Sequence, residues 1–216
     1  MKIEQIIKKL NNTELGKTGI HETYVQIPTE LDVSGIFDQA ERAIPFVDKT
    51  TRLDYGSRDN IRLTIAREHR ICGLGQYYRD KDLSAGDEIL FEKRTSGDNA
   101  EYFLDVRKLT NTLVLKKDNN KGYEVLTPKR LCLFQKGEVL EKETKKPILI
   151  NFYQSIRKRA DSKELTNYYK ILLDGVVFQN TFANNTLIEI EVINGIATIR
   201  KSPTWKRIEF TQEVEL

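Results

Sequence analysis

The sequence predicts a mostly β protein with short helices, of the α+β class. Several short segments alternate apolar and polar residues, as half-buried strands do. Stretches rich in Gly, Asp, Asn and Ser separate these segments, and few stretches show helical periodicity. Many short strands with few helices are typical of a barrel or a sandwich.

The first elements are expected in the order helix, strand, helix. Residues 1–10 predict an amphipathic helix, because apolar residues recur at the spacing of one helix face: Ile3, Ile6, Ile7 and Leu10. Residues 23–28 predict a half-buried strand that has Tyr24 or Val25 facing inward and ends at Pro28. A short helix follows, with Ser34 as its N-cap and Ile36 and Phe37 packing inward.

Strands dominate the next part of the chain. Four segments have the alternating or continuous apolar pattern of strands: residues 61–65, 88–92, 102–106 and 112–115. Residues 117–122 are polar and turn-forming, which predicts a domain boundary between residues 1–116 and residues 123–216.

The carboxyl-terminal part predicts a smaller α+β unit. Residues 147–159 are expected to open as a strand, Ile148 to Ile150, and to continue as a helix through Tyr153 and Ile156. Strands are expected over residues 168–178 and 187–199, and the second folds back at Asn194-Gly195, a pair suited to a two-residue hairpin.

Composition excludes several classes of protein. Hydrophobic residues make up 39% of the 216 residues and charged residues 31%, which suits a folded domain and not a disordered chain. No apolar run is long enough to span a bilayer and the first ten residues lack a signal-peptide core, so a cytoplasmic protein without a membrane partner is expected. Cys72 and Cys132 form no CxxC pair and are interpreted as small buried apolar residues.

Net charge alone does not indicate a nucleic-acid partner. The 35 basic and 32 acidic residues give a net charge of +3, which many soluble proteins carry. Basic residues nevertheless concentrate between residues 52 and 81, with later clusters at residues 129–130 and 157–159. Solvated faces balanced by acids would give the same pattern.

The sequence offers little for catalysis. His21 and His69 are the only histidines, so histidine-rich metal sites are excluded, and neither a GxSxG nor a P-loop motif is present. Asp174, Glu189 and Glu191 are the best nuclease candidates, because carboxylates on neighbouring strands can hold Mg²⁺. An ordinary half-exposed strand has the same alternation as residues 188–192. No resident metal or cofactor is expected, and Mg²⁺ enters only under this alternative.

Three segments together resemble a known DNA-binding fold. Residues 73–92 resemble the closing part of the plant transcription-factor pseudobarrel, in which Leu83, Gly86, Asp87 and Phe91 match recurring positions. Residues 13–110 resemble the amino-terminal effector domain of the EcoRII restriction endonuclease. Two motifs carry that resemblance: Thr18, Gly19, His21, Ile27 and Pro28 in the first, and Ser57, Arg58, Asp59, Arg62, Leu63 and Thr64 in the second.

The resemblance implies a DNA-binding pseudobarrel that grips the major groove with two arms. It places Lys17, Thr18, His21 and Glu22 in the first arm, and Ser57, Arg58, Asp59, Asn60 and Arg62 in the second. Tyr55 stands where the family has a glycine, with Gly56 one place later, which changes the path of the second arm. Phosphate contacts are assigned to Arg67, Arg70, Arg79 and Lys81.

These observations leave three hypotheses. The first is sequence-specific binding of double-stranded DNA, as the target-recognition module of a restriction system whose nuclease or NTPase activity lies in a partner subunit or another domain, including McrBC-like subunits. The second is a small Mg²⁺-dependent restriction endonuclease whose catalytic centre lies in the carboxyl-terminal unit. The third is a β domain that binds a small molecule or a protein.

Overall fold

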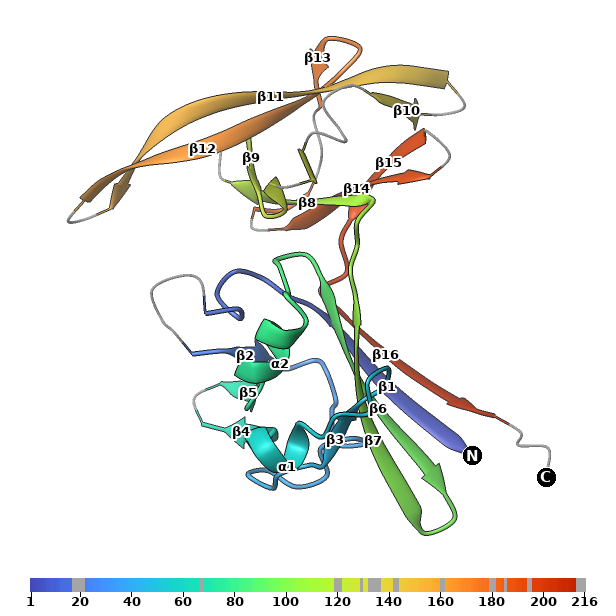
Figure 1. The fold of residues 1–216 in the computed structure, drawn as a ribbon. Helices are drawn as coiled ribbons and strands as arrows, with labels where there is room; N and C mark the ends of the chain where they lie inside the picture. The colour runs from blue at the N-terminus through green and yellow to red at the C-terminus, as the bar shows by residue number, and fades with distance from the viewer. Residues whose placement is uncertain are drawn as a thin grey trace. The chain divides into compact units, whose positions relative to one another are not determined.

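A computed structural model gives the structure of the chain (Figure 1). The structure describes all residues except 17–21, 67, 119–121, 129, 132–136, 142–143, 160–161, 179–181, 185, 194–195 and 213–216. For some strand residues it describes the backbone alone: 137, 139–141, 144–145, 153, 155–159, 162–166 and 192–193. The fold is mostly β, with two short helices in the described part, as the sequence predicts.

The chain forms two compact units that differ from the predicted division. Unit 1 comprises residues 1–108 and 204–216, and unit 2 comprises residues 109–203. The stretch expected as a boundary instead joins two strands of unit 2, where Asp118 pairs with Gly122 across a hairpin. A polar, turn-forming stretch marks a hairpin as well as a linker, so composition alone does not separate the two.

Unit 1 contains a five-stranded sheet. Its strands follow one another in this spatial order: β16 (Trp205–Thr211), β1 (Lys2–Lys9), β6 (Glu88–Ser96), β7 (Asn99–Arg107) and β3 (Phe46–Asp48). The rings of Phe37, Phe46 and Phe91 pack together on it, with centroids 5.6–5.7 Å apart. β16 therefore completes the edge of a sheet whose other strands come from the first half of the chain.

Residues 1–10 form strand β1, and the predicted helix is wrong. Ile3, Ile6 and Ile7 are buried, as the pattern suggests, but so are the charged residues Lys8 and Lys9. Lys8 pairs with Glu14 and Lys9 with Glu88, so the polar positions do not form a solvated helix face. The apolar residues of this central strand have the spacing of a helix face, and its buried charged residues occupy the positions that a helix would expose to solvent.

A three-stranded sheet and both helices also belong to unit 1. The sheet has the order β2 (Tyr24–Gln26), β5 (His69–Cys72) and β4 (Arg62–Ile65). Helix α1 (Gly56–Asp59) precedes β4, and helix α2 (Gly75–Asp80) follows β5. The strand predicted over residues 23–28 is confirmed, and both Tyr24 and Val25 are buried.

The helix predicted after Ser34 is absent from the described residues around it. Residues 34–36 form a turn in which Asp32, and not Ser34, accepts a backbone hydrogen bond from the amide of Ser34 at 2.9 Å. Ile36 and Phe37 are nevertheless buried, as expected. One turn suffices to bring both side chains into the core, so the chain does not continue as a helix.

Unit 2 is built on a closed sheet. Seven strands pair in a ring, in the order β11 (Thr144–Arg159), β10 (Gly137–Glu141), β15 (Ile196–Lys201), β14 (Leu187–Ile193), β8 (Thr112–Asp118), β9 (Gly122–Val125) and β12 (Ser162–Leu173). The pairing of β11 with β12 closes the ring, and the short β13 (Val176–Val177) adds to β12. The core includes Leu113, Ile148, Ile171 and Ile188.

The helix predicted after Ile150 is wrong, because β11 continues as a strand to Arg159. β12 supplies the hydrogen-bonding partner, with Asn151 opposite Lys170 and Arg159 opposite Ser162. The hairpin predicted within residues 187–199 agrees with the pairing of Ile193 with Ile196. No helix of the described chain is long and apolar enough to cross a membrane.

Candidate nucleic-acid interface

The two predicted arms lead into the two outer strands of the three-stranded sheet. β2 and β4 both run antiparallel to β5, and Tyr24 and Arg62, their first residues, both lie opposite Cys72. The segments that precede β2 and β4 therefore leave the sheet at the same end. The points at which these segments join β2 and β4 are two strand spacings apart, which is roughly 9.5 Å.

The segment Gly73-Leu74-Gly75 continues from β5 between the ends of the arms. A Cβ on Gly73, whose φ is +85°, would lie 2.5 Å from the carbonyl oxygen of Asp59 in the second arm. A Cβ on Gly75 would lie 3.0 Å from Oγ1 of Thr23, just after the first arm. Both glycines let the chain pass close to an arm, which larger residues would push outward.

Helix α1 gives the second arm a defined conformation. Asp54 accepts a hydrogen bond of 3.0 Å from the amide of Ser57 at the start of the helix. Gly56 packs against the backbone, so that an added Cβ would lie 2.1 Å from the carbonyl oxygen of Ile44. Asn60 ends the helix in the left-handed conformation, with φ of 54°. Ser57 and Arg58 are thereby held exposed on a rigid turn.

Two tyrosines connect α1 with α2. The hydroxyl of Tyr55 donates a hydrogen bond of 2.8 Å to Asp80, and its ring meets the ring of Tyr77 edge-on, with centroids 4.9 Å apart. Burial, followed by the bond to Asp80, raises the pKa of Tyr55 to about 12. The same bond, with one from Gln76, lowers the pKa of the Asp80 carboxyl. Asp80 thus stays charged and holds α1 in place.

Arg58 and Arg79 are the predicted contacts that lie most open to a ligand. Both are exposed, and the charges of both contribute to the lowered pKa of Asp80, after its hydrogen bonds from Tyr55 and Gln76. Arg79 donates a hydrogen bond of 2.7 Å to Gln76, whereas Arg58 forms no ion pair within the described part of the chain. An arginine that forms no ion pair can donate both of its paired N–H groups to a base edge or a phosphate.

Three other predicted contacts already have partners within the protein. Arg62 pairs with Glu41 at 3.1 Å. Lys81 lies 2.7 Å from Asp48, whose side chain is fully buried, so its charge is used to stabilise the fold. Glu22 lies 3.9 Å from Arg70.

Arg70 is held from several sides. Its guanidinium pairs with Glu68 at 2.7 Å and lies 4.2 Å from the centroid of the Tyr24 ring. These contacts make Arg70 a weaker candidate for a phosphate than its sequence position suggests.

Several predicted residues lie outside the described residues. Lys17, Thr18 and His21 of the first arm belong to this group, as do Arg67 and Cys132. Asp59 of the second arm is described, and its Oδ2 atom is buried without a hydrogen-bond partner.

Glu14 forms hydrogen bonds with residues before and after the first arm. Its buried carboxylate accepts hydrogen bonds of 3.0 Å from the amides of Asn11, before the arm, and Gln26, after it. Its carbonyl oxygen accepts a third, of 3.1 Å, from the amide of Tyr24. Lys8 neutralises the carboxylate at 2.8 Å. The base of the arm is therefore fixed by one residue that the sequence analysis did not single out.

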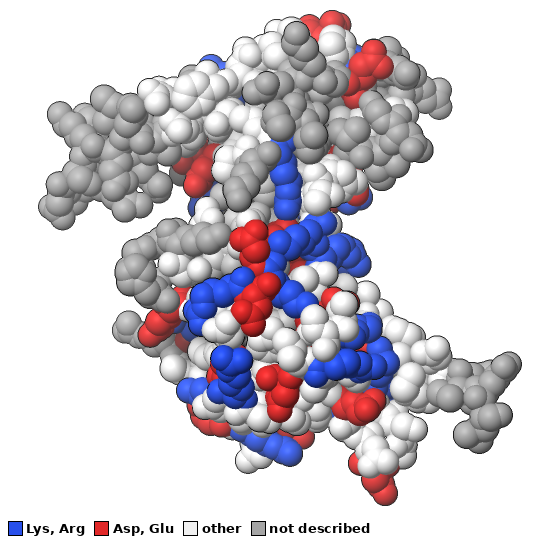
Figure 2. All heavy atoms as spheres, in the orientation of Figure 1, with Lys and Arg blue, Asp and Glu red and all other residues white. Residues whose placement is uncertain are grey.

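Basic and acidic side chains alternate on the face of unit 1 that Figure 2 shows. In the view of Figure 2, Lys and Arg are interspersed with Asp and Glu and form no uninterrupted basic area. A general positive field is therefore not what would attract DNA to this face. Affinity would depend on a few well-placed arginines.

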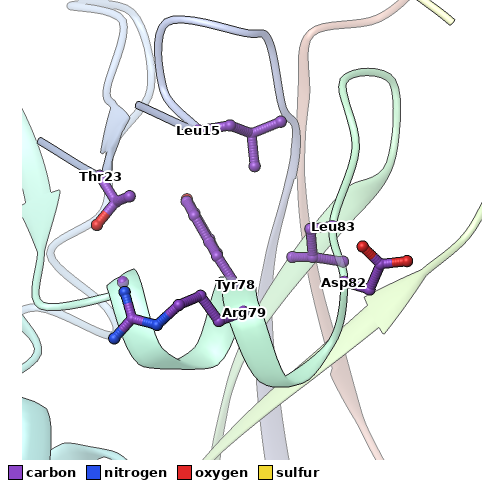
Figure 3. A pocket seen from close by; sticks show the side chains of 7 residues that line it. Leu15, Thr23, Tyr78, Arg79, Asp82 and Leu83 are labelled. Atoms are coloured by element: carbon purple, nitrogen blue, oxygen red, sulfur yellow. The ribbon is translucent and has the colours of Figure 1, made fainter. Parts of the chain in front are cut away.

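A pocket opens beside the base of the first arm (Figure 3). It has a volume of about 440 Å³, and residues of three segments line it: Leu15, Thr23, Gly75, Tyr78, Arg79, Asp82 and Leu83. Tyr78 is 5% exposed, and its hydroxyl donates a hydrogen bond of 3.2 Å to the carbonyl of Tyr24. This hydrogen bond connects α2 with β2 at the wall of the pocket.

The carboxylates of the nuclease alternative are not brought together. Asp174 is exposed in the turn between β12 and β13, whereas Glu189 and Glu191 lie on β14, which is not adjacent to β12. Arg200 binds Glu189 at 2.6 Å and Glu191 at 2.9 Å. Among the residues that the structure describes, no group of three His, Cys, Asp or Glu side chains could hold a metal ion.

Sequence reasoning missed the residues that position the arms. Gly73, Gly75 and Asp80 belong to no predicted arm, Glu14 belongs to no motif, and Tyr55 stood out only as a departure from the family's glycine. The two closely spaced glycines Gly73 and Gly75 were the one available signal, because glycine is typical of close backbone approaches. Comparison of the chain with protein-family models, curated proteins and solved structures found no match.

Proposed function

We propose that unit 1 binds double-stranded DNA sequence-specifically through the two arms. The observation that supports this proposal is the pairing of Tyr24 and Arg62 with Cys72, because the strands that follow the two arms then begin at the same end of one sheet. The starts of β2 and β4 lie roughly 9.5 Å apart, which suits two protein segments that enter a major groove about 12 Å wide. Arg58, exposed on a rigid helical turn, is the residue proposed to contact a base edge.

In this proposal some of the remaining predicted residues contact DNA directly and others support the residues that do. Arg79 holds a phosphate, and the first arm, with Lys17, Thr18, His21 and Glu22, completes the grip. Arg62 and Lys81 act mainly through Glu41 and Asp48, as supports for the arm and for α2.

The biological setting that we propose is a restriction system. Its support is the resemblance of the two arm motifs, in order and spacing, to the EcoRII effector domain, and of Leu83, Gly86, Asp87 and Phe91 to the plant transcription-factor pseudobarrel. In this setting the protein is cytoplasmic, recognises the target, and works with a nuclease or NTPase subunit or domain.

Selection from randomised duplexes tests the proposal. The full chain is incubated with a randomised library, bound duplexes are recovered over several rounds, and the enriched sequence is tested by electrophoretic shift against a scrambled duplex. We expect enrichment of one short motif and binding that weakens as salt rises. Recovery of no motif, with equal affinity for both duplexes, would show that the protein is not a sequence-specific DNA-binding protein.

A matched pair of variants locates the interface. Arg58→Ala removes an exposed charge from the second arm, and Lys206→Ala removes one from the edge strand β16 of the five-stranded sheet. We expect only Arg58→Ala to weaken binding to the selected duplex. Equal losses would place the interface elsewhere.

A further inference from the structure

Strand β16 lies at the edge of the five-stranded sheet of unit 1 (Figure 1). It pairs with β1 on one side, and no described strand pairs with its other side. All residues from Lys206 to Thr211 are exposed, and they include Ile208 and Phe210, which are 39% and 42% exposed. A row of unpaired backbone groups beside exposed apolar side chains is a template for pairing with another strand.

Alternate residues of β16 direct their backbone groups away from β1. Met1 and Gln212 exchange two backbone hydrogen bonds, of 2.9 and 3.0 Å. Because every second pair of an antiparallel ladder is bonded in this way, Ile208 and Phe210 also direct their backbone groups toward β1. The residues whose N–H and C=O groups point to the open edge are therefore Trp205, Arg207, Glu209 and Thr211.

These outward residues complement one another when a second copy of β16 is laid antiparallel along the open edge. In the register centred on Ile208, Arg207 of each copy lies opposite Glu209 of the other, and Trp205 lies opposite Thr211. Each such pair can exchange two backbone hydrogen bonds, and the opposite charges attract each other on both sides of the two-fold axis. Within one copy Arg207 contacts Asp32, so the new pairs extend an existing charge network.

The charges also select this register. A shift by one step in either direction centres the pairing on Arg207 or on Glu209, and two guanidinium groups or two carboxylates then lie directly opposite each other. Like charges in such positions destabilise a sheet. Charged residues commonly keep edge strands apart, but here they repel a second copy only when its register is wrong.

The exposed apolar residues meet on one face of the joined sheet. Ile208 lies opposite Ile208 of the second copy in a pair without hydrogen bonds, where side chains approach most closely. Phe210 of the second copy is its diagonal neighbour on the same face. Ile3, which pairs with Phe210 across β1, is 4% exposed. The contact between copies therefore continues an apolar surface that begins inside the sheet.

We propose that β16 is the interface of a homodimer, in which the five-stranded sheets of two copies join into one continuous sheet through antiparallel pairing centred on Ile208. Each copy contributes the same residues, so the association closes at two copies. The inference goes beyond the proposed function and does not depend on it. Its test contains no DNA, so either can fail without the other.

Sedimentation equilibrium of the full chain over a concentration series tests the proposal. We expect a reversible equilibrium between one chain and two. Ile208→Lys sets two ammonium groups opposite each other and should raise the dimer dissociation constant by at least about tenfold. Ile65→Lys is the matched control, because Ile65 is 54% exposed on β4, and it should leave the constant unchanged. A wild-type chain that is monomeric at every concentration, or equal effects of both variants, would overturn the inference.

Two charge reversals give an independent measurement. Arg207→Glu and Glu209→Arg each place like charges opposite each other, so each variant alone should be monomeric. Their mixture should form a mixed dimer, because the two glutamates of one chain then face the two arginines of the other. Native mass spectrometry with one chain isotopically labelled detects this species. A mixture that does not associate, although the wild-type chain does, would show that the copies meet through another surface.

Melting curves accompany each variant. Arg207→Glu loses the contact with Asp32, and if this variant does not fold, the comparison of Ile208→Lys with Ile65→Lys decides the matter.

Discussion

The hydroxyl of Tyr55 donates a hydrogen bond of 2.8 Å to Asp80 and so joins the helix of the second arm to α2. Tyr55→Phe removes this bond and leaves the ring in place. We expect a loss of about 1 kcal/mol in the free energy of unfolding in urea and a several-fold loss of affinity for the selected duplex. Tyr102→Phe, on β7, is the matched control, and an equal effect of both changes would show that Tyr55 does not position the arm.

Substitutions of Arg58 and of Arg79 should weaken DNA binding in different ways. Arg58→Ala is expected to cost about 1–3 kcal/mol of binding and to relax the choice at one base pair, because a base contact is lost. Arg79→Ala is expected to weaken binding to all sequences and to reduce the salt slope by about one, as loss of a phosphate contact does. Titrations of selected and scrambled duplexes at several salt concentrations separate the two. Identical profiles would contradict the assignment.

Gly73 is expected to tolerate no side chain. Gly73→Ala places a Cβ 2.5 Å from the carbonyl oxygen of Asp59 at a φ of +85°, and backbone cannot move aside as a side chain can. We expect a loss of about 1–3 kcal/mol in the free energy of unfolding. Gly97→Ala shares a positive φ, +57°, but meets nothing within 4 Å. The difference between the two variants in urea denaturation measures the steric contact alone.

Glu14 and Lys8 should be strongly coupled. Glu14→Gln leaves the buried ammonium of Lys8 without its counter-charge, and we expect a loss of about 3 kcal/mol. In the double variant Lys8→Met, Glu14→Gln the uncompensated charge is gone, so the loss should be smaller. A double-mutant cycle in urea checks this expectation, and additive losses would show that the pair is not coupled.

Asp48 should make unit 1 sensitive to acid. Burial would raise the pKa of its carboxyl, but hydrogen bonds from Lys81, Thr51 and Tyr77 outweigh it and lower the pKa below the ordinary value of 3.8. The folded state thus binds a proton less readily than the unfolded state, so the contribution to stability is present above pH 3.8 and is lost as pH falls through the folded pKa. Urea denaturation between pH 6 and pH 3 should show a steeper decline for wild type than for Asp48→Asn.

Sequence patterns predicted the β class and four of the eight described strands of unit 1, β2, β4, β6 and β7, because alternation along residues such as 61–65 and 102–106 follows directly from one buried face. They failed at residues 1–10 and 147–159. At the first of these, buried ion pairs of Lys8 and Lys9 imitate a helical pattern. At residues 147–159, periodicity is judged from the segment itself, whereas β12, the strand that pairs with it, lies further along the chain.

The candidate site was only partly accessible to prediction. Motif order located the second arm and Arg58, but the helix that fixes them depends on Tyr55, Gly56 and Asp80, which meet only after folding. The ion pairs of Arg62 and Lys81 depend likewise on Glu41 and Asp48, which no sequence spacing connects to them.

Pairing of β16 with β1 means that unit 2 is inserted into unit 1 and that unit 1 is finished last. On the ribosome, residues 109–203 emerge as a continuous folding unit while β1 still lacks a neighbour on one side. A fragment that ends near residue 116 would leave that isoleucine-rich edge open to association with other chains. Expression of unit 1 alone therefore calls for joining residue 108 to residue 204 through a short linker.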